Sequence, residues 1–205
     1  MATGGAERTA VVDIVVKIGG GVLAHAAHLD AALAAIGAAG RERRLLIVPG
    51  GGPFADAVRE VDRRIRLSDA AAHWMALLAM DQYAHLVASR LAGSVLVTKR
   101  HEIAAALDAP VRQIPVLAPY RWLREADPLP RTWMVTSDSI AAWVAGAVGA
   151  RRIVLVKPPG AADPGGGDLV DAYFSRTLPA HVTSVIVPAD HLDALQSALR
   201  GSRSG

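Results

Sequence analysis

The sequence predicts an α/β fold, a three-layer αβα sandwich in which helices cover both faces of a mainly parallel sheet. Short apolar runs without polar alternation recur along the chain, and alanine-rich or amphipathic stretches separate them. Such runs are typical of parallel strands buried on both faces, and their alternation with helices favours a parallel sheet. We expect one domain over residues 11–200, between flexible ends at 1–10 and 201–205.

The composition excludes several classes of protein. Hydrophobic residues make up 52% of the 205 residues, charged residues 20% and aromatic residues 4%, and there is no cysteine. Disulfides, thiolate metal sites and cysteine nucleophiles are therefore excluded. No apolar run approaches the roughly 18–20 residues that cross a membrane, and the first ten residues lack the apolar centre of a signal peptide. We expect a cytoplasmic protein without a membrane partner.

The net charge of +3 suits an anionic partner. The arginines are spread along the chain, and no aromatic-basic motif accompanies them. We therefore favour small anionic substrates such as nucleotides and expect no nucleic-acid partner. Steeply salt-dependent binding to DNA or RNA would mark the alternative.

The first predicted strand ends at a loop suited to phosphate. Residues 11–16 are mostly β-branched, Lys17 follows them, and Gly19, Gly20 and Gly21 begin two residues later. Consecutive glycines let the backbone approach a ligand and leave N–H groups free for phosphate oxygens, while a lysine adds a compact positive charge. The stretch predicts the phosphate end of a kinase active site.

A second strand repeats this pattern. Residues 29–39 are alanine-rich and predict a helix that Gly40 ends, and the apolar run 45–48 predicts the next strand. That strand runs into a second glycine triplet, Gly50, Gly51 and Gly52. Because ligands of an open parallel sheet lie beyond the carboxyl ends of its strands, we expect both glycine loops at one site.

Two helices should follow the second glycine loop. Residues 54–66 carry Arg59, Arg63 and Arg66 on one face. Solvation is the expected role of most of them, and the alternative for one is a contact with an acceptor's anionic group.

The next helix should run from the N-cap Ser68 to about Leu91. Asp69 and His73 fall on the same side of it as the apolar stripe. This stripe consists of Leu77, Met80, Ala84, Val87 and Leu91. Asp69 and His73 either line the acceptor pocket or serve as a helix cap and a core histidine.

The middle of the chain predicts strands at 94–98 and 114–117 around a short helix at 102–107. Prolines border the segment 120–133, which we expect to be a loop that acts as a lid or as a simple crossover.

The last third adds a carboxylate and a second lysine. Thr136 or Ser137 should cap a helix whose first turn contains Asp138, a position that the helix dipole alone would explain. The apolar strand 152–157 then ends, like the first, at Lys157.

Beyond Lys157 we expect a loop at 160–167 and an irregular piece at 168–174. A last strand at 182–187 and a closing helix capped by Asp190 complete the prediction.

Three elements resemble the amino acid kinase superfamily in order and spacing. They are Lys17-Ile18-Gly19-Gly20-Gly21, Pro49-Gly50-Gly51-Gly52 and Thr136-Ser137-Asp138-Ser139. The resemblance spans about residues 11–190 and implies the carbamate kinase-like fold of that superfamily. No Walker-type or Gly-x-Gly-x-x-Gly motif is present in the sequence.

Within the superfamily the chain looks most like a short archaeal and methylotroph branch. The assigned member of that branch phosphorylates an aminomethyl-furan methyl phosphate in methanofuran biosynthesis, a part of one-carbon metabolism. The similarity lies in the shortness of the chain and in residues 72–83, 135–140 and 168–174. Two features depart from the superfamily. Isopentenyl phosphate kinases have a histidine soon after the second glycine loop, but no histidine closely follows Gly52 here. Residues 158–162 also lack the usual Val-Asp-Gly-Val/Ile-Tyr stretch.

The resemblance implies an ATP-dependent kinase and a role for each motif. Lys17 should contact the transferring phosphoryl group, Lys157 the nucleotide side, and Asp138 should orient both lysines. The residues implied at the ATP phosphates are Gly19, Gly20, Gly21, Thr136 and Ser137. Those implied at the acceptor are Gly50, Gly51, Gly52, Asp69 and His73. Mg²⁺ should lie on the nucleotide phosphates, with no metal site made by protein side chains.

The acceptor class remains open at this point. No residue presents itself as a general base, which suits an acceptor that is already an anion, a phosphate or a carboxylate. Besides the furan phosphate, uridylate or another small phosphate or carboxylate is an alternative substrate. A non-catalytic nucleotide- or anion-binding storage protein is the alternative of another class. Members of the superfamily usually form homo-oligomers, and we expect the same here.

Overall fold

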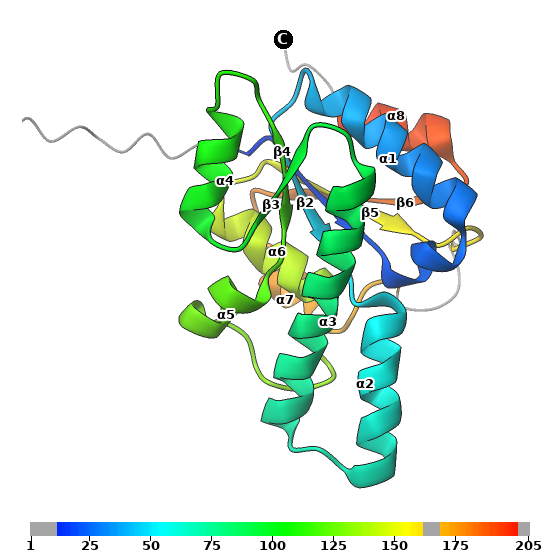
Figure 1. Cartoon of the computed structure of the whole chain (residues 1–205), viewed down its shortest axis with the longest axis vertical. Coiled ribbons are helices and arrows are strands. Elements are labelled where there is room, and N and C mark those ends of the chain that lie inside the picture. Colours follow the sequence, from blue (N-terminus) through cyan, green and yellow to red (C-terminus); the bar gives the residue numbers. More distant parts are fainter. Residues whose placement is uncertain (1–11, 162–168, 201–205) are drawn as a thin grey trace, which may run out of the picture.

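The computed structural model describes residues 12–161 and 169–200, which contain one parallel sheet of six strands (Figure 1). The strands are β1 Ile14–Ile18, β2 Leu45–Pro49, β3 Ser94–Val97, β4 Ile114–Leu117, β5 Arg152–Lys157 and β6 Thr183–Pro188. They lie in the order β3-β4-β2-β1-β5-β6, and each pair of neighbours is parallel. The expected α/β class and parallel sheet are confirmed.

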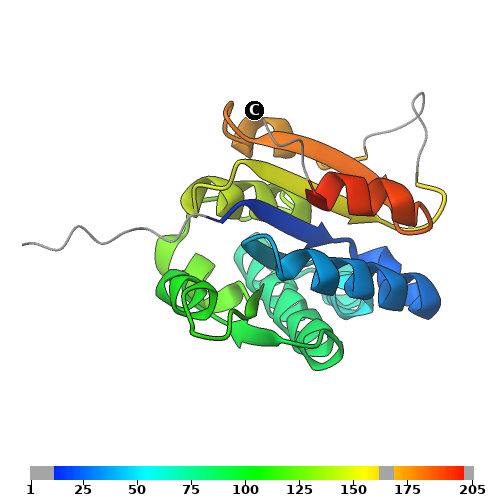
Figure 2. The same cartoon turned by 90° about the horizontal axis from the view of Figure 1, so that it is seen from above.

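Helices cover both faces of this sheet (Figure 2). They are the 3₁₀ helix η1 Gly20–Ala24 and the α-helices α1 Ala26–Gly40, α2 Gly52–Ile65, α3 Asp69–Arg90, α4 Arg100–Leu107, α5 Tyr120–Ala126, α6 Ser137–Ala147, α7 Phe174–Thr177 and α8 Leu192–Arg200. The core on one face includes residues of α1, α8 and the second half of α3. The core on the other includes residues of α4, α5, α6 and α7 together with the first half of α3.

The two cores divide the strand residues by alternation. Val15 and Leu46 belong to the core on the α6 face, whereas Val16 and Ile47 belong to the core on the α1 face. All four side chains are completely buried, because successive strand residues point to opposite sides and both sides are covered. This arrangement explains the unbroken apolar runs.

Several elements differ from those expected. Residues 120–126 form helix α5 rather than a loop, because Trp122 and Leu123 are buried and the Asp81 carboxylate accepts a hydrogen bond from the Tyr120 backbone N–H. Helix α8 begins at Leu192, so His191 and not Asp190 immediately precedes it. The irregular piece at 168–174 leads into α7, and most of the loop expected at 160–167 lies outside the described residues.

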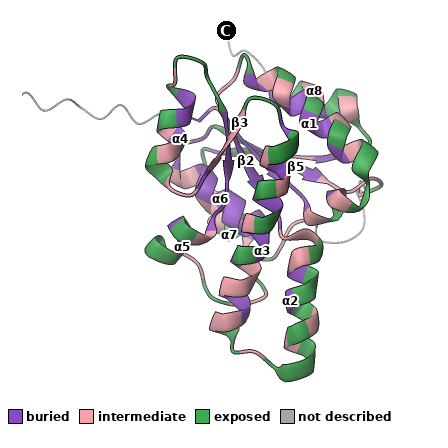
Figure 3. Cartoon of the chain, in the orientation of Figure 1, coloured by how far each residue is buried: buried purple, intermediate pink, exposed green. Residues whose placement is uncertain are grey.

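Helices α2 and α3 form a hairpin that extends beyond the carboxyl end of the sheet (Figure 1). Its outer surface is largely exposed or half-buried, in contrast to the buried strands (Figure 3). Among the described residues no helix is long and apolar enough to span a bilayer. The α2–α3 hairpin forms a wall beside the ends of β1 and β2 (Figure 1).

Candidate functional site

The two glycine loops meet backbone against backbone at the carboxyl end of the sheet. A Cβ atom placed on Gly20 would lie 2.4 Å from the backbone nitrogen of Gly52 and 2.7 Å from its Cα. Gly52 also has a positive φ of 53°, which favours glycine. Both loops thus need their glycines for this close approach, as the repeated strand-then-glycine pattern predicts.

Backbone hydrogen bonds hold the loops to the strand ends. The Gly19 N–H donates to the Val156 carbonyl over 2.7 Å, and the Gly50 N–H donates to the Ile18 carbonyl over 2.8 Å. A Cβ on Gly50 would also lie 3.1 Å from the Ser137 hydroxyl, at the start of α6. The ends of β1, β2 and β5 and the N-termini of α2 and α6 therefore converge on one place, where helix N-termini favour anions.

Lys17, Asp138 and Lys157 lie together at this point, and we call them the lysine–aspartate cluster. The Lys17 Nζ lies 2.8 Å from Asp138 Oδ1, and the Lys157 Nζ donates a hydrogen bond of 2.8 Å to Asp138 Oδ2. Both contacts of the Asp138 carboxylate are thus close ion pairs with an ammonium group. Lys17 and Asp138 are only 3% and 5% exposed. Asp138 is thus a buried carboxylate between two ammonium groups, and the helix dipole alone does not explain its position.

Burial and charge act in opposite directions on the cluster. Burial alone would raise the pKa of Asp138, but the Lys17 and Lys157 charges hold it below its ordinary value. Burial lowers the pKa of Lys17 most strongly, the Asp138 carboxylate opposes this, and the like charge of Lys157 adds to it. Asp138 is therefore held ionised, and it compensates the charge of two lysines at once.

The first turn of α6 holds Asp138 in place. Thr136 is the N-cap, and its hydroxyl accepts a hydrogen bond from the Asp138 backbone N–H. The Asp171 carboxylate contacts the same turn and accepts from the backbone N–H groups of Thr136 and Ser139. Sequence reasoning missed Asp171; its only signal was its place within residues 168–174.

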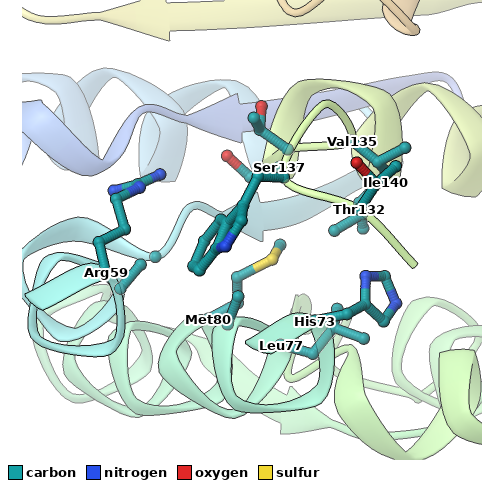
Figure 4. Close-up of a pocket in the computed structure, with 13 residues that line it drawn as sticks. Arg59, His73, Leu77, Met80, Thr132, Val135, Ser137 and Ile140 are labelled. Carbon is teal, nitrogen blue, oxygen red and sulfur yellow. The ribbon is translucent and has the colours of Figure 1, made fainter. Parts of the chain in front are cut away.

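A pocket with a cavity volume of about 50 Å³ opens beside Gly51 and the first turn of α6 (Figure 4). It is lined by Gly51, Ala55, Arg59, His73, Ala76, Leu77, Met80, Thr132, Trp133, Val135, Thr136, Ser137 and Ile140. In Figure 4, Arg59 and His73 lie toward opposite ends, with Met80 between them. The pocket is thus mostly apolar, with one cation and one imidazole.

Of the two α3 residues predicted at the acceptor, the structure places one in the pocket and the other outside it. His73 is buried and lines the pocket, where burial lowers its pKa against the smaller opposing effect of Asp127. Asp69 is exposed and does not line the pocket, so its expected inward orientation is wrong. It occupies the first position of α3, near the tip of the hairpin (Figure 1), and it is exposed there.

A pocket wall is formed by Trp133, which sequence reasoning did not assign, and by Arg59, one of the three arginines named above. The Trp133 indole N–H donates a hydrogen bond of 2.7 Å to Asp62, and the Arg59 guanidinium lies 5.4 Å from the centre of the same ring. Asp62 also accepts from the Leu67 backbone N–H over 2.8 Å. Trp133 is therefore held against α2 by two contacts.

The arrangement fits nucleotide phosphates better than a metal held by side chains. The described residues contain no group of three or more His, Asp or Glu placed to hold a metal ion. The glycine loops leave no room for side chains, and two ammonium groups stand beside them. Lys17, Lys157 and the loop amides are suited to hold phosphate oxygens, on which Mg²⁺ usually keeps several of its waters.

Comparison with known proteins gives a consistent picture. A model of the amino acid kinase family matches residues 14–158. The 5-(aminomethyl)furan-3-yl-methyl phosphate kinase of Methanocaldococcus jannaschii is 28% identical over 144 residues, which are 69% of this chain and 63% of that protein. The match thus spans less than two thirds of this relative's length.

Solved structures of similar shape include two uridylate kinases. The enzyme from Archaeoglobus fulgidus superposes with a TM-score of 0.65 at 13% identity, covering 93% of this chain and 97% of that one. UMP kinase from Bacillus anthracis gives 0.66 at 14% identity, with coverages of 93% and 92%. At these identities the likeness shows a shared fold.

Proposed function

Since this chain belongs to the amino acid kinase family, we propose that it is an ATP-dependent kinase whose acceptor is a small molecule bearing a phosphate. The observation that carries the proposal is the buried lysine–aspartate cluster at the meeting point of two glycine loops. A storage protein needs an anion site, but it does not need a buried lysine and a half-buried lysine held by one carboxylate.

In the proposed reaction an acceptor oxygen bonds to the γ-phosphorus of ATP as the bond to the β–γ bridging oxygen breaks and ADP leaves. Little covalent chemistry is asked of the protein, so catalysis rests on positioning and charge stabilisation. The amides of Gly19, Gly20 and Gly21 hold the phosphates, and the N-terminus of α6 at Thr136 and Ser137 faces the same charge. Bound Mg²⁺ would neutralise part of the phosphate charge.

The cluster supplies the positive charge at the transferring group. Lys17 lies 2.8 Å from Asp138 Oδ1 as an ion pair, and an ammonium group with three N–H donors can also serve the γ-phosphoryl oxygens. Lys157 donates to Asp138 and serves the nucleotide side. Asp138 keeps both ammonium groups in place, which charge stabilisation of this kind requires before the reaction begins.

The pocket beside Gly51 holds the acceptor in this proposal. Gly50, Gly51 and Gly52 face its reacting group, Arg59 offers a charge for a phosphate, and the buried His73 recognises a polar group at the other end. The apolar wall between them suits a small flat ring. The best candidate is the aminomethyl-furan methyl phosphate on which the archaeal relative is named to act, and UMP is the runner-up.

A coupled ADP-release assay with the furan phosphate and with UMP tests the proposal. We expect turnover with the furan phosphate, and Lys17→Ala and Asp138→Asn should each lower kcat by at least about 100-fold while the fold is kept. Lys99→Ala is the matched control, since Lys99 also follows a strand but pairs with the exposed Glu125. Binding of ATP with no turnover of any phosphate or carboxylate acceptor would instead identify a storage or binding protein.

A further inference from the structure

A second carboxylate, that of Asp171, holds the first turn of α6 from outside the lysine–aspartate cluster. Its Oδ2 accepts from the backbone N–H of Thr136 over 3.1 Å, from the Thr136 hydroxyl over 2.7 Å and from the backbone N–H of Ser139 over 3.0 Å. Its Oδ1 accepts from the Ser139 hydroxyl and, over 3.0 Å, from the Tyr173 backbone N–H. Five donors thus converge on one side chain.

Asp138 lies between the two residues that Asp171 holds. Because Thr136 and Ser139 flank it in the same turn, fixing them fixes the backbone from which the Asp138 side chain projects. Asp171 comes from a distant part of the chain, beyond β5. Its charge also acts on Lys17, whose pKa it raises in the same direction as Asp138 does.

We propose that Asp171 is a positioning residue for phosphoryl transfer, which holds the first turn of α6 so that the Asp138 carboxylate meets both lysines. This inference rests on the proposed function, because it concerns the geometry of that reaction. Misplacing a catalytic group by about 1 Å costs on the order of 100-fold in rate, so a small shift of α6 has a measurable effect.

The site requires a carboxylate rather than an amide. All five partners of Asp171 donate hydrogen bonds. An asparagine in either orientation places its NH₂ group against two or three of these donors, so part of the turn must move away. A glutamate keeps the charge but shifts the oxygens by about one bond length, so it separates position from charge.

The first experiment compares Asp171→Asn with Glu102→Gln. Glu102 is a matched control, because its carboxylate accepts from the backbone N–H groups of Thr98 and Lys99 at the start of α4, outside the site. We expect Asp171→Asn to lower kcat by about 10- to 100-fold with less than a threefold change in the KM for ATP. Both variants should lower Tm by a few degrees, but Glu102→Gln should leave kcat within about twofold of the wild type.

Two further variants keep the test decisive. Asp171→Glu should lose kcat as Asp171→Asn does, whereas full activity in this variant would mean that charge alone matters and would overturn the positioning role. Should Asp171→Asn fail to fold, Ser139→Ala removes only one of the five donors and should still lower kcat by about threefold. Unchanged kcat in Ser139→Ala with a lowered Tm would reduce Asp171 to a structural cap.

A readout without turnover separates this inference from the proposed function. Titration of the Lys17 side chain by ¹³C NMR in the free protein should show a lower pKa in Asp171→Asn than in the wild type, and an unchanged pKa in Glu102→Gln. An unchanged Lys17 pKa in Asp171→Asn would contradict the inference. Absence of wild-type turnover with an altered Lys17 titration would contradict the proposed function and leave the link between Asp171 and the cluster standing.

Discussion

At the scale of single residues, the site depends on places where a side chain is missing as much as on charged groups. The contact between Gly20 and Gly52 leaves no space for one methyl group, since the nearest backbone atoms would lie 2.4 and 2.7 Å away. Neither atom belongs to a flexible side chain. The loops must separate if Gly20 gains a Cβ, whereas a Cβ on Gly52 is disfavoured by its positive φ.

Gly20→Ala should therefore lower kcat by at least about 100-fold and reduce stability by about 1–3 kcal/mol. Gly37→Ala is the control, because a Cβ on this residue of α1 would meet only the Leu91 side chain, at 3.4 Å. It should stabilise the protein by about 0.5–1 kcal/mol and leave kcat unchanged. Urea unfolding and the ADP-release assay measure both effects, and a fully active Gly20→Ala would contradict the assigned closeness of the loops.

The sequence allows Lys17, Asp138 and Lys157 to be selected because each follows a strand end or begins a helix, and parallel strands bring these points to one edge. It does not place Asp69 correctly, it names Arg59 only as one of three arginines, and it does not assign Asp171. Helical periodicity places Asp69 on the same side of α3 as the apolar stripe. It does not show that this end of α3 extends beyond the sheet, where Asp69 is exposed. Contacts between distant segments decide the other two.

At the scale of elements, helix α5 is held to α3 by a half-buried carboxylate. Asp81 accepts a hydrogen bond of 3.0 Å from the Tyr120 backbone N–H. Burial nevertheless raises the pKa of Asp81 to about 6, against the smaller opposing effects of that bond and of His85. The folded state therefore binds a proton more tightly at this site than the unfolded chain does.

The wild type should lose stability from this group as the pH rises from about 4 to above 6, because the stabilising proton leaves through the folded pKa. Asp81→Asn keeps a neutral side chain and an oxygen for Tyr120 at every pH. The variant should be more stable than the wild type by about 1–2 kcal/mol at pH 8 and no more stable at pH 4. Urea unfolding of both proteins at the two pH values is the measurement; equal curves at pH 8 would refute the expectation.

Residues 127–135 connect α5 to the site and supply one wall of the pocket. Trp133→Phe removes the indole N–H that donates to Asp62 and keeps an aromatic ring. We expect the KM for the acceptor to rise about 3- to 10-fold, with kcat and the KM for ATP nearly unchanged, because one hydrogen bond is lost at the pocket wall. Trp143→Phe, in the core beside Trp122, is the control and should leave both KM values unchanged.

At the scale of the whole molecule, a ligand that binds the folded chain must stabilise it. ATP–Mg²⁺ at 100 times its Kd should add about 2.7 kcal/mol, which raises the Tm of a chain this long by about 5–10 °C. AMP lacks the β- and γ-phosphates that the glycine loops and lysines are proposed to hold, so it should give a much smaller shift at equal concentration. Equal shifts with ATP and AMP would place the phosphates elsewhere.

Much of the architecture follows from local pattern, whereas the order of the strands does not. All six strands were expected, five of them within one residue at each end and the first from a start three residues too early, because burial on both faces demands apolar runs. The order β3-β4-β2-β1-β5-β6 depends on how each connecting helix packs, and helix α5 depends on its docking to α3. The expected homo-oligomer remains a prediction, which light scattering of the purified protein can test.

The contact of Gly20 with Gly52 also bears on how such a protein changes over generations. The separation between the two glycine loops, which we propose to hold donor and acceptor, is set by main-chain atoms that point mutations elsewhere do not replace. The pocket walls, in contrast, are side chains such as Arg59, Met80 and Trp133. Substitutions of these side chains can therefore change which acceptor is bound, while the distance between the two glycine loops stays the same.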